Sequence, residues 1–364
     1  MTSPTDSFTV AAVRSAALES AIAARPQDFR VLSGDRPTGP LHLGHYLGTV
    51  ANRIRLQRLG VEVFVLIADY QVVTDRDGVG RMSANVLELL ADHLAAGIDP
   101  ATATVFTHSA VPALNQLVLP FLSLVTDSEL HRNPTVRAED AASGSRPLSG
   151  LLLTYPVHQA ADILFCHADL VPVGRDQLPH LETTRTIARR FNARYAGGTP
   201  LFTEPDALLT EAPALLGTDG TKMSKSRGNA IELRATEDET AQLIRRARTD
   251  GERRITYDPA TRPEVASLLL TAALCTGGDP AALAESIGAG GSTALKVVVT
   301  EAVNEHLRPI RRRRAELARD PGHLLDVLAR GNATANRVAE ATLDQVRQAM
   351  DMDYRHDPGD RATA

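Results

Sequence analysis

Short segments typical of strands alternate with longer helical stretches from residue 29 to about residue 234, and this alternation constrains the fold most strongly. Four segments have the character of strands: residues 29–33, 61–67, 103–107 and 170–173. Four longer stretches have the character of helices: residues 41–59, 81–96, 152–165 and 177–195. We also expect a last short strand at residues 230–233. Strands separated by helices favour an α/β fold with a doubly wound parallel sheet, which binds ligands beyond the carboxyl ends of its strands.

Strand signals nearly vanish beyond residue 235. Six segments there look helical: residues 236–248, 263–275, 281–287, 292–314, 323–328 and 332–350. Residues 114–146 are also expected to be helical, ending in a polar loop, and residues 10–24 to form a short alanine-rich helix. We therefore predict four parts: a leader at residues 1–28, an α/β body at 29–234, an all-helical C-terminal domain at 235–350 and a tail at 351–364.

Composition narrows the class of protein. The 364 residues are enough for two domains. With 39 basic and 44 acidic residues the formal charge is −5, which excludes a histone-like polycation but not a local basic surface. We find neither a run of about 20 apolar residues nor the basic start and apolar stretch of a secretory signal. Cys166 and Cys275 have no metal-ligand spacing. We expect a cytoplasmic protein without a membrane partner.

The first segment that suits phosphate chemistry is residues 33–46, which leave a strand, pass glycines and prolines, and enter a helix. A helix N-terminus offers unpaired N–H groups and a partial positive charge. His42 and His45, three residues apart, project from one side of the first turn, and Gly44 lets a nucleotide approach the backbone. The alternative is a helix cap with two surface histidines.

The second segment, residues 215–226, is rich in Gly, Thr and Asp and carries Lys222 and Lys225. Lysine is a compact, mobile charge that can follow a phosphate whose charge grows in a transition state. The alternative is an ordinary solvated loop.

Taken together, the two segments resemble those of a known enzyme class. His42-Leu43-Gly44-His45 resembles the His-Ile-Gly-His signature of class I aminoacyl-tRNA synthetases, and residues 222–226 match their Lys-Met-Ser-Lys-Ser signature. The resemblance implies a Rossmann-like catalytic domain, with catalytic roles for His42, His45, Lys222 and Lys225. The implied ATP-binding residues are Arg36, Pro37, Thr38, Gly44, His45, Gly174, Arg175, Asp176, Lys222, Met223, Ser224, Lys225 and Ser226.

A helix with Tyr-Pro-x-x-x-Ala-Ala-Asp-Ile-Leu, residues 155–164, precedes Val-Pro-Val-Gly-x-Asp-Gln at 171–177. Both resemble tryptophanyl-tRNA synthetases, and the resemblance runs from about residue 30 to 350. Tyr155, Gln159 and Asp162 recur at steps of four and three, so they share one helix face. A carboxylate at Asp162 can accept the single N–H of an indole and reject a ring without it by roughly 10⁴–10⁵. The alternative for Asp162 is a structural cap or salt bridge.

The expected tryptophan-binding residues are Asp162, Tyr155, Gln159, Gln177 and Gln71. The sequence departs from the common bacterial pattern, with Gln159 in place of Met, Gln71 in place of His, Arg36 in place of Gln and His45 in place of Asn. We interpret the chain as a divergent subtype whose pocket treats indole-based inhibitors differently.

The resemblance implies ATP-dependent attachment of L-tryptophan to tRNA(Trp) through tryptophanyl-adenylate. It also implies a homodimer, Mg²⁺ on the phosphates without a protein cage, and a helical domain that reads the anticodon. Two arginine clusters are candidate tRNA contacts or merely solvated faces: Arg308 with Arg311–Arg314, and Arg245, Arg246, Arg248, Arg253 and Arg254. The rivals are a tyrosine-specific relative, another nucleotidyltransferase and a non-catalytic regulatory paralogue.

Overall fold

The computed structural model describes residues 7–74, 80–142, 147–174, 177–209, 215–224 and 227–354. Its centre is one five-stranded sheet in the order β3-β2-β1-β4-β5, with every neighbouring pair parallel. The strands are β1 Arg30–Asp35, β2 Glu62–Ile67, β3 Ala103–Thr107, β4 Leu170–Val173 and β5 Asp206–Leu209. The order reverses direction between β1 and β4, which is the switch point where such sheets bind ligands. The predicted doubly wound parallel sheet is confirmed.

One predicted strand is wrong and one real strand was missed. Residues 230–233 do not join the sheet; Glu232 forms an isolated antiparallel bridge with His42 instead. The missed strand is β5, which follows a polar turn. Only its two central residues are buried, so its hydrophobic pattern in the sequence is weak.

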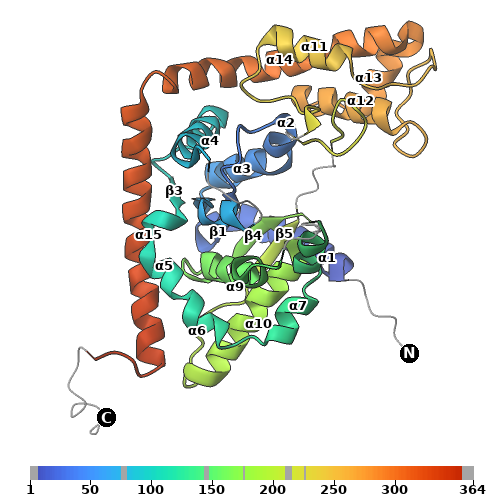
Figure 1. Ribbon diagram of the computed structural model, residues 1–364. Coiled ribbons are helices and arrows are strands. Elements are labelled where there is room, and N and C mark those ends of the chain that lie inside the picture. The colour runs from blue at the N-terminus through green and yellow to red at the C-terminus, as the bar shows by residue number, and fades with distance from the viewer. Residues whose placement is uncertain are drawn as a thin grey trace, which may run out of the picture.

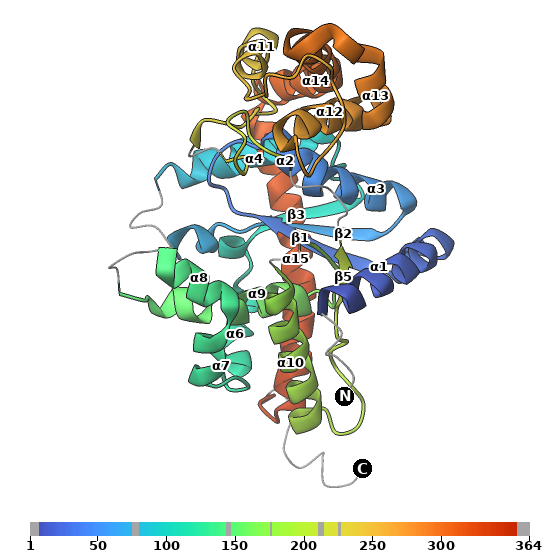
Figure 2. The same cartoon turned by 90° about the vertical axis from the view of Figure 1, so that its right-hand side faces the viewer.

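Helices cover both faces of the sheet, with α2–α4 on one face and α8–α10 on the other (Figure 2). Their bounds are α1 Ser7–Ala24, α2 Leu43–His45, α3 Ala51–Leu59, α4 Met82–Ala96, α5 Pro112–Gln116, α6 Val118–Leu122, α7 Asp127–Arg132, α8 Pro134–Ala142, α9 Gly150–Leu164 and α10 Leu178–Tyr195. The predicted single helix at residues 41–59 is interrupted, because a π-helical turn, Tyr46–Val50, separates α2 from α3. Such turns are frequent at functional sites.

The C-terminal part is helical, as predicted: α11 Glu237–Arg245, α12 Pro263–Thr276, α13 Pro280–Ile287, α14 Gly291–Leu317 and α15 Pro321–Ala349. Helices α11–α14 gather at one end of the molecule (Figure 1), whereas α15 turns back and runs along the α/β body. The predicted break near residue 330 does not exist. Gly331 lies there because a Cβ at that position would lie 1.8 Å from the carbonyl oxygen of Val105 on β3.

Alternate residues of the strands enter two cores, as the period of a strand buried on both faces requires. Val31, Val63 and Val105 pack with α3, α4 and α12–α14. Leu32, Phe64 and Phe106 pack against α9 and α10. Helix α15 contributes to both cores. No single helix among the described residues is long and apolar enough to cross a membrane; one pair, Pro263–Thr276 with Pro280–Leu317, passes that test only together and is bent by 111°.

Candidate active site

A cavity of about 570 Å³ opens at the carboxyl ends of β1 and β4. Twelve of the predicted site residues line it: Arg36, His42, Gly44, His45, Gln71, Tyr155, Gln159, Asp162, Gly174, Gln177, Lys222 and Met223. Pro37, Thr38 and Ser224 are described but do not line it. Arg175, Asp176, Lys225 and Ser226 lie outside the described residues. The cavity therefore joins three parts of the chain: residues 42–45, here called the histidine turn, the described residues 215–224, here called the lysine loop, and the polar face of α9.

The two histidines cap the helix and face the cavity at once. The His45 backbone N–H donates to His42 Nδ1 at 3.3 Å, and the His42 backbone N–H donates to His45 Nδ1 at 3.4 Å. Their rings stack with centroids 3.6 Å apart. Because each Nδ1 accepts a hydrogen bond, the proton of each neutral ring sits on Nε2. The turn thus presents two side-chain donors without a fixed positive charge.

Backbone hydrogen bonds fix this histidine turn on both sides. The Leu43 N–H donates to the carbonyl of Ile231 at 2.8 Å, and the Leu233 N–H donates to the carbonyl of Leu41 at 2.9 Å. The Leu41 N–H donates to a carboxylate oxygen of Asp92 on α4, also at 2.8 Å. The segment that the sequence predicted as a strand therefore serves the site.

The base of the lysine loop is held by a side chain that the sequence analysis missed, Asn229, which is 2% exposed. Its Oδ1 accepts the Ser224 N–H at 2.7 Å, and its amide donates to Asp219 at 2.8 Å. Gly217 leaves room for it, because a Cβ there would lie 2.3 Å from Asn229. This scaffold places Lys222 on the cavity, which argues against an ordinary solvated loop.

A buried ion pair forms the floor beneath the histidine turn. Arg53 is 1% exposed, pairs with the Asp35 carboxylate, and donates from Nε to Ser33 Oγ at 2.7 Å. His93 Nε2 lies 3.2 Å from the same carboxylate. Burial would raise the pKa of Asp35, but the charges and hydrogen bonds of Arg53 and His93 outweigh it and hold that pKa well below its usual range. This pair joins the end of β1 to α3.

The opposite wall comes from α9 and its neighbours. The Tyr155 hydroxyl lies 3.0 Å from His180 Nε2, and burial raises the pKa of Tyr155. Asp162 is 4% exposed and accepts a hydrogen bond from His108 Nε2 at 2.8 Å. Gln71 lies 3.1 Å from His158 Nδ1 through its amide nitrogen. Asp162 therefore does have a structural partner, as the alternative held, but it still lines the cavity.

Three buried histidines, His108, His158 and His180, were not predicted as functional. One signal was available for His108, since it directly follows a predicted strand and so falls at the carboxyl edge of the sheet. A second was available for His158, since it lies one helical turn before Asp162.

The atoms of His108, His158 and Asp162 lie within 4.8 Å of one another, close enough to hold a metal ion. Their nearest nitrogens and oxygens are already satisfied by hydrogen bonds: His108 donates to Asp162, and His158 Nε2 lies 2.9 Å from Asn115 Oδ1. These bonds engage the atoms of the three side chains that face one another, whereas His108 Nδ1 is buried without a hydrogen-bond partner among the described residues.

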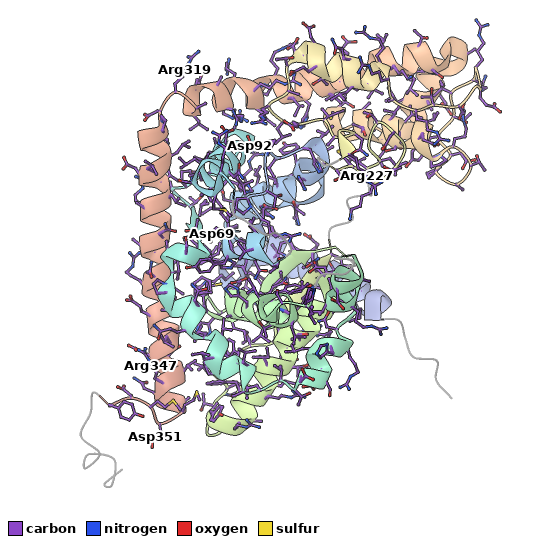
Figure 3. All side chains as sticks on the ribbon, viewed as in Figure 1. Asp69, Asp92, Arg227, Arg319, Arg347 and Asp351 are labelled. Atoms are coloured by element: carbon purple, nitrogen blue, oxygen red, sulfur yellow. The ribbon has the colours of Figure 1, made fainter. Side chains whose placement is uncertain are left out.

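The arginine run on α14 is not one solvated face. Arg313 donates to the carbonyl of Ala95 at 2.7 Å, and Arg314 Nε donates to Asp92 at 2.6 Å. Arg311 donates to Asn304 and Thr240, whereas Arg312 is exposed. Figure 3 labels Asp92 on α4, next to α14. Much of the run therefore binds the protein itself.

A doubly wound sheet with a histidine turn after β1, which shares its cavity with the described start (residues 222–224) of a Lys-Met-Ser-Lys-Ser segment, defines a class I aminoacyl-tRNA synthetase. Residues 25–308 match the family described as class I tRNA synthetases (W and Y). The tryptophan–tRNA ligase of Treponema pallidum is 41% identical over 334 residues, 90% of this chain and 98% of that relative. That of Clostridium longisporum is 38% identical over 335 residues, 89% and 97% of the two chains.

Among solved structures, tryptophanyl-tRNA synthetase from Campylobacter jejuni complexed with ADP and tryptophan matches with a TM-score of 0.75 at 28% identity. The match covers 88% of this chain and 99% of that one. The chain therefore belongs to the tryptophan–tRNA ligases, within the class I family of tryptophan and tyrosine enzymes.

Proposed function

We infer that the chain attaches L-tryptophan to tRNA(Trp) at the expense of ATP, through a tryptophanyl-adenylate. The observation that carries this function is the shared cavity, which His42, His45 and Lys222 line together with Asp162. Donors for phosphate and an acceptor for an indole N–H thus face one space. The same arrangement speaks against a non-catalytic paralogue, and the tryptophan-specific relatives disfavour the tyrosine-specific reading.

In the first step the tryptophan carboxylate attacks the α-phosphorus of ATP, and pyrophosphate leaves. Such chemistry needs positioning and charge stabilisation more than covalent help. We assign the Nε2–H groups of His42 and His45 to phosphate oxygens and assign Lys222, with Lys225, to the departing pyrophosphate. Gly44 supports this role because a side chain at this position would press on the His42 ring and on Met223, which line the same cavity. Arg36 and Gly174, which line the same cavity, are assigned to ATP as well.

The amino acid is proposed to lie along α9. Asp162 accepts the indole N–H, and Gln71 and Gln159 bound the ring. We assign the Tyr155 hydroxyl oxygen and the Gln177 amide oxygen, from two residues that line the cavity, to the α-ammonium group as acceptors. In the second step a ribose hydroxyl of the terminal adenosine of tRNA attacks the acyl carbon, the bond from that carbon to the phosphate oxygen breaks, and AMP leaves.

Mg²⁺ supplies charge neutralisation on the phosphates when it accompanies ATP. Three described carboxylates line the cavity. Asp35 is engaged by Arg53, Asp162 by His108 and Glu139 by the Tyr155 hydroxyl. This fits an ion held by phosphate oxygens and water rather than by a protein cage. The residues left to act on the nucleotide are therefore donors, not metal ligands.

We further propose that the chain works as a cytoplasmic homodimer and that helices α11–α14 contact tRNA. Exposed Arg312 and Arg245 are the candidates, since both lie on these helices and point to solvent. Phosphate contacts of this kind make binding salt-dependent.

ATP–pyrophosphate exchange with each of the twenty amino acids tests the proposed function. Exchange should depend on tryptophan, and charging should follow with a tRNA(Trp) transcript but not with tRNA(Tyr). Exchange driven by tyrosine would support the tyrosine-specific alternative. No exchange with any amino acid would support the regulatory paralogue.

A further inference from the structure

We propose that His108 is a positioning residue that sets the selectivity of the site for the indole N–H, by orienting the Asp162 carboxylate. The proposal rests on the function inferred above, in which Asp162 receives that N–H. His108 does not itself line the cavity, so it would act through Asp162 rather than touch the substrate.

His108 and Asp162 form a short hydrogen bond, and both side chains are buried. His108 belongs to the short turn His108–Ala110 after β3 and is fully buried, while Asp162 is 4% exposed on α9. His108 Nε2 lies 2.8 Å from Asp162 Oδ1. A carboxylate only accepts, so the proton of this bond belongs to His108. With Oδ1 bound from behind, Oδ2 is the oxygen assigned to the substrate.

The ring of His108 has no room to turn away. It lies against the His158 ring, tilted by 30° at a centroid distance of 4.4 Å, and stacks on Tyr70 at 6.1 Å. Its backbone carbonyl accepts a hydrogen bond from the Asn115 amide at 2.8 Å. Behind it lies Asp69, whose Oδ1 is 4.0 Å from His108 Nδ1 and accepts the Ser109 N–H at 3.1 Å. Figure 3 labels Asp69 in the middle of the body.

A second chain of hydrogen bonds explains why His108, and not His158, serves Asp162. The Gln71 amide nitrogen can only donate, so His158 Nδ1 accepts at 3.1 Å. The proton of His158 then sits on Nε2 and points to Asn115 Oδ1 at 2.9 Å, while Asp162 Oδ1 is 4.0 Å away. Gln71 thus fixes the tautomer of His158 and leaves the donation to Asp162 to His108.

The consequence is a preorganised acceptor. A buried carboxylate without its donor would rotate toward whatever polar group it can reach, because an unpaired buried charge is costly. The indole N–H would then lose its fixed partner. Selectivity for the N–H, rather than folding or ATP binding, is the property that depends on this one bond.

The test compares tryptophan with an analogue whose ring N–H is replaced by sulfur, in ATP–pyrophosphate exchange. The variants are His108→Phe, which keeps a flat buried ring without a donor, and His108→Gln, whose amide can donate near the Nε2 position. Asp162→Asn reports the loss of the acceptor charge, and His323→Phe, exposed on α15, is the matched control.

We expect the wild-type preference for tryptophan, taken as the ratio of kcat/KM values, to fall at least about 10-fold in His108→Phe, toward the value in Asp162→Asn. The KM for ATP should change less than about 3-fold, and His108→Gln should recover most of the preference. His323→Phe should behave as wild type.

A preference that stays at the wild-type value in His108→Phe would overturn the proposal, even if overall activity falls. If His108→Phe does not fold, His108→Asn, whose shorter amide cannot reach Asp162, takes its place, and a wild-type preference there has the same meaning. If the wild-type protein shows no tryptophan-dependent exchange, the proposed function itself is contradicted. This result is distinct from failure of the His108 proposal, which requires an active wild type with an unchanged preference in the variant.

Discussion

Met223 lies directly over Gly44. A Cβ at position 44 would lie 3.2 Å from the sulfur of Met223 and 3.1 Å from His42 Nδ1. Residues 179 positions apart in the chain thus bring the lysine loop into contact with the histidine turn. This contact is the physical basis for treating the two segments as one nucleotide site.

Gly44→Ala tests that contact. The added methyl must displace either Met223 or the His42 ring, so we expect ATP–pyrophosphate exchange to fall at least about 10-fold, since small misplacements of positioning groups cost up to about 10² in rate. Gly150→Ala, at the start of α9 where nothing lies within 4 Å of the new Cβ, should leave the rate unchanged. Equal rates in the two variants would contradict the contact.

Arg314→Met tests a link between the helical domain and the histidine turn. Asp92 is fully buried and accepts from Arg314 with one oxygen and from the Leu41 N–H with the other. Removing the arginine leaves a buried charge unpaired, so we expect a loss of about 3 kcal/mol in urea unfolding and slower adenylate formation.

Arg312→Met is the matched control, because Arg312 is exposed on the same helix. It should leave stability and exchange at wild-type values and weaken only tRNA charging. If Arg314→Met keeps the wild-type exchange rate and stability, the bonds from Arg314 through Asp92 to Leu41 do not support the histidine turn.

Gly331→Ala tests the packing of α15 on the sheet. Alanine is the better helix former by about 1 kcal/mol, but its methyl would overlap the carbonyl of Val105. We expect a net destabilisation of about 2 kcal/mol in urea unfolding, because overpacking a tight contact costs about 1–3 kcal/mol. A more stable variant would mean that α15 does not lie against β3 in solution.

The free energy of unfolding at low pH tests the Asp35–Arg53 ion pair. The pKa of Asp35 in the folded chain lies well below its unfolded value of about 3.9. The pair therefore stabilises the fold fully above about pH 4, and this stabilisation is lost as the pH falls toward the folded pKa. Asp35→Asn should be less stable at pH 7 and lose less stability between about pH 4 and 2, measured by urea unfolding.

The exposed carboxylate of Asp326 on α15 provides the comparison. Asp326→Asn should be as stable as the wild type at pH 7. A wild-type slope in Asp35→Asn below pH 4 would remove Asp35 from the groups that govern acid unfolding.

The sequence predicted four of the five strands, the major helices and the segments that meet at the cavity, because these carry strong local patterns. It placed a strand at residues 230–233 because apolar character alone does not tell whether a short extended segment joins the sheet or pairs with a turn. It broke α15 near Gly331 because a glycine in a helix usually signals an end, whereas here it permits a backbone contact with β3.

The polar partners behind the site were less predictable. His108 and Arg53 act through hydrogen bonds to residues 54 and 20 positions away. Asn229 bonds within its own loop, to Ser224, but neither case follows a periodic pattern in the sequence. The predicted ligands, by contrast, sit at helix starts and on one helix face, where a periodic pattern reveals them. Sequence analysis therefore found twelve residues that line the cavity and missed the hydrogen-bond partners that fix them.

The central claim is that the lysine loop and the histidine turn act on one triphosphate, and Lys222→Ala tests it most directly. Removing one preorganised charge should slow tryptophanyl-adenylate formation by about 10²–10³. Tryptophan affinity, measured by calorimetry, should change less than about 3-fold, and Lys296→Ala on α14 should match wild type. A Lys222→Ala variant that forms adenylate at the wild-type rate would contradict the account.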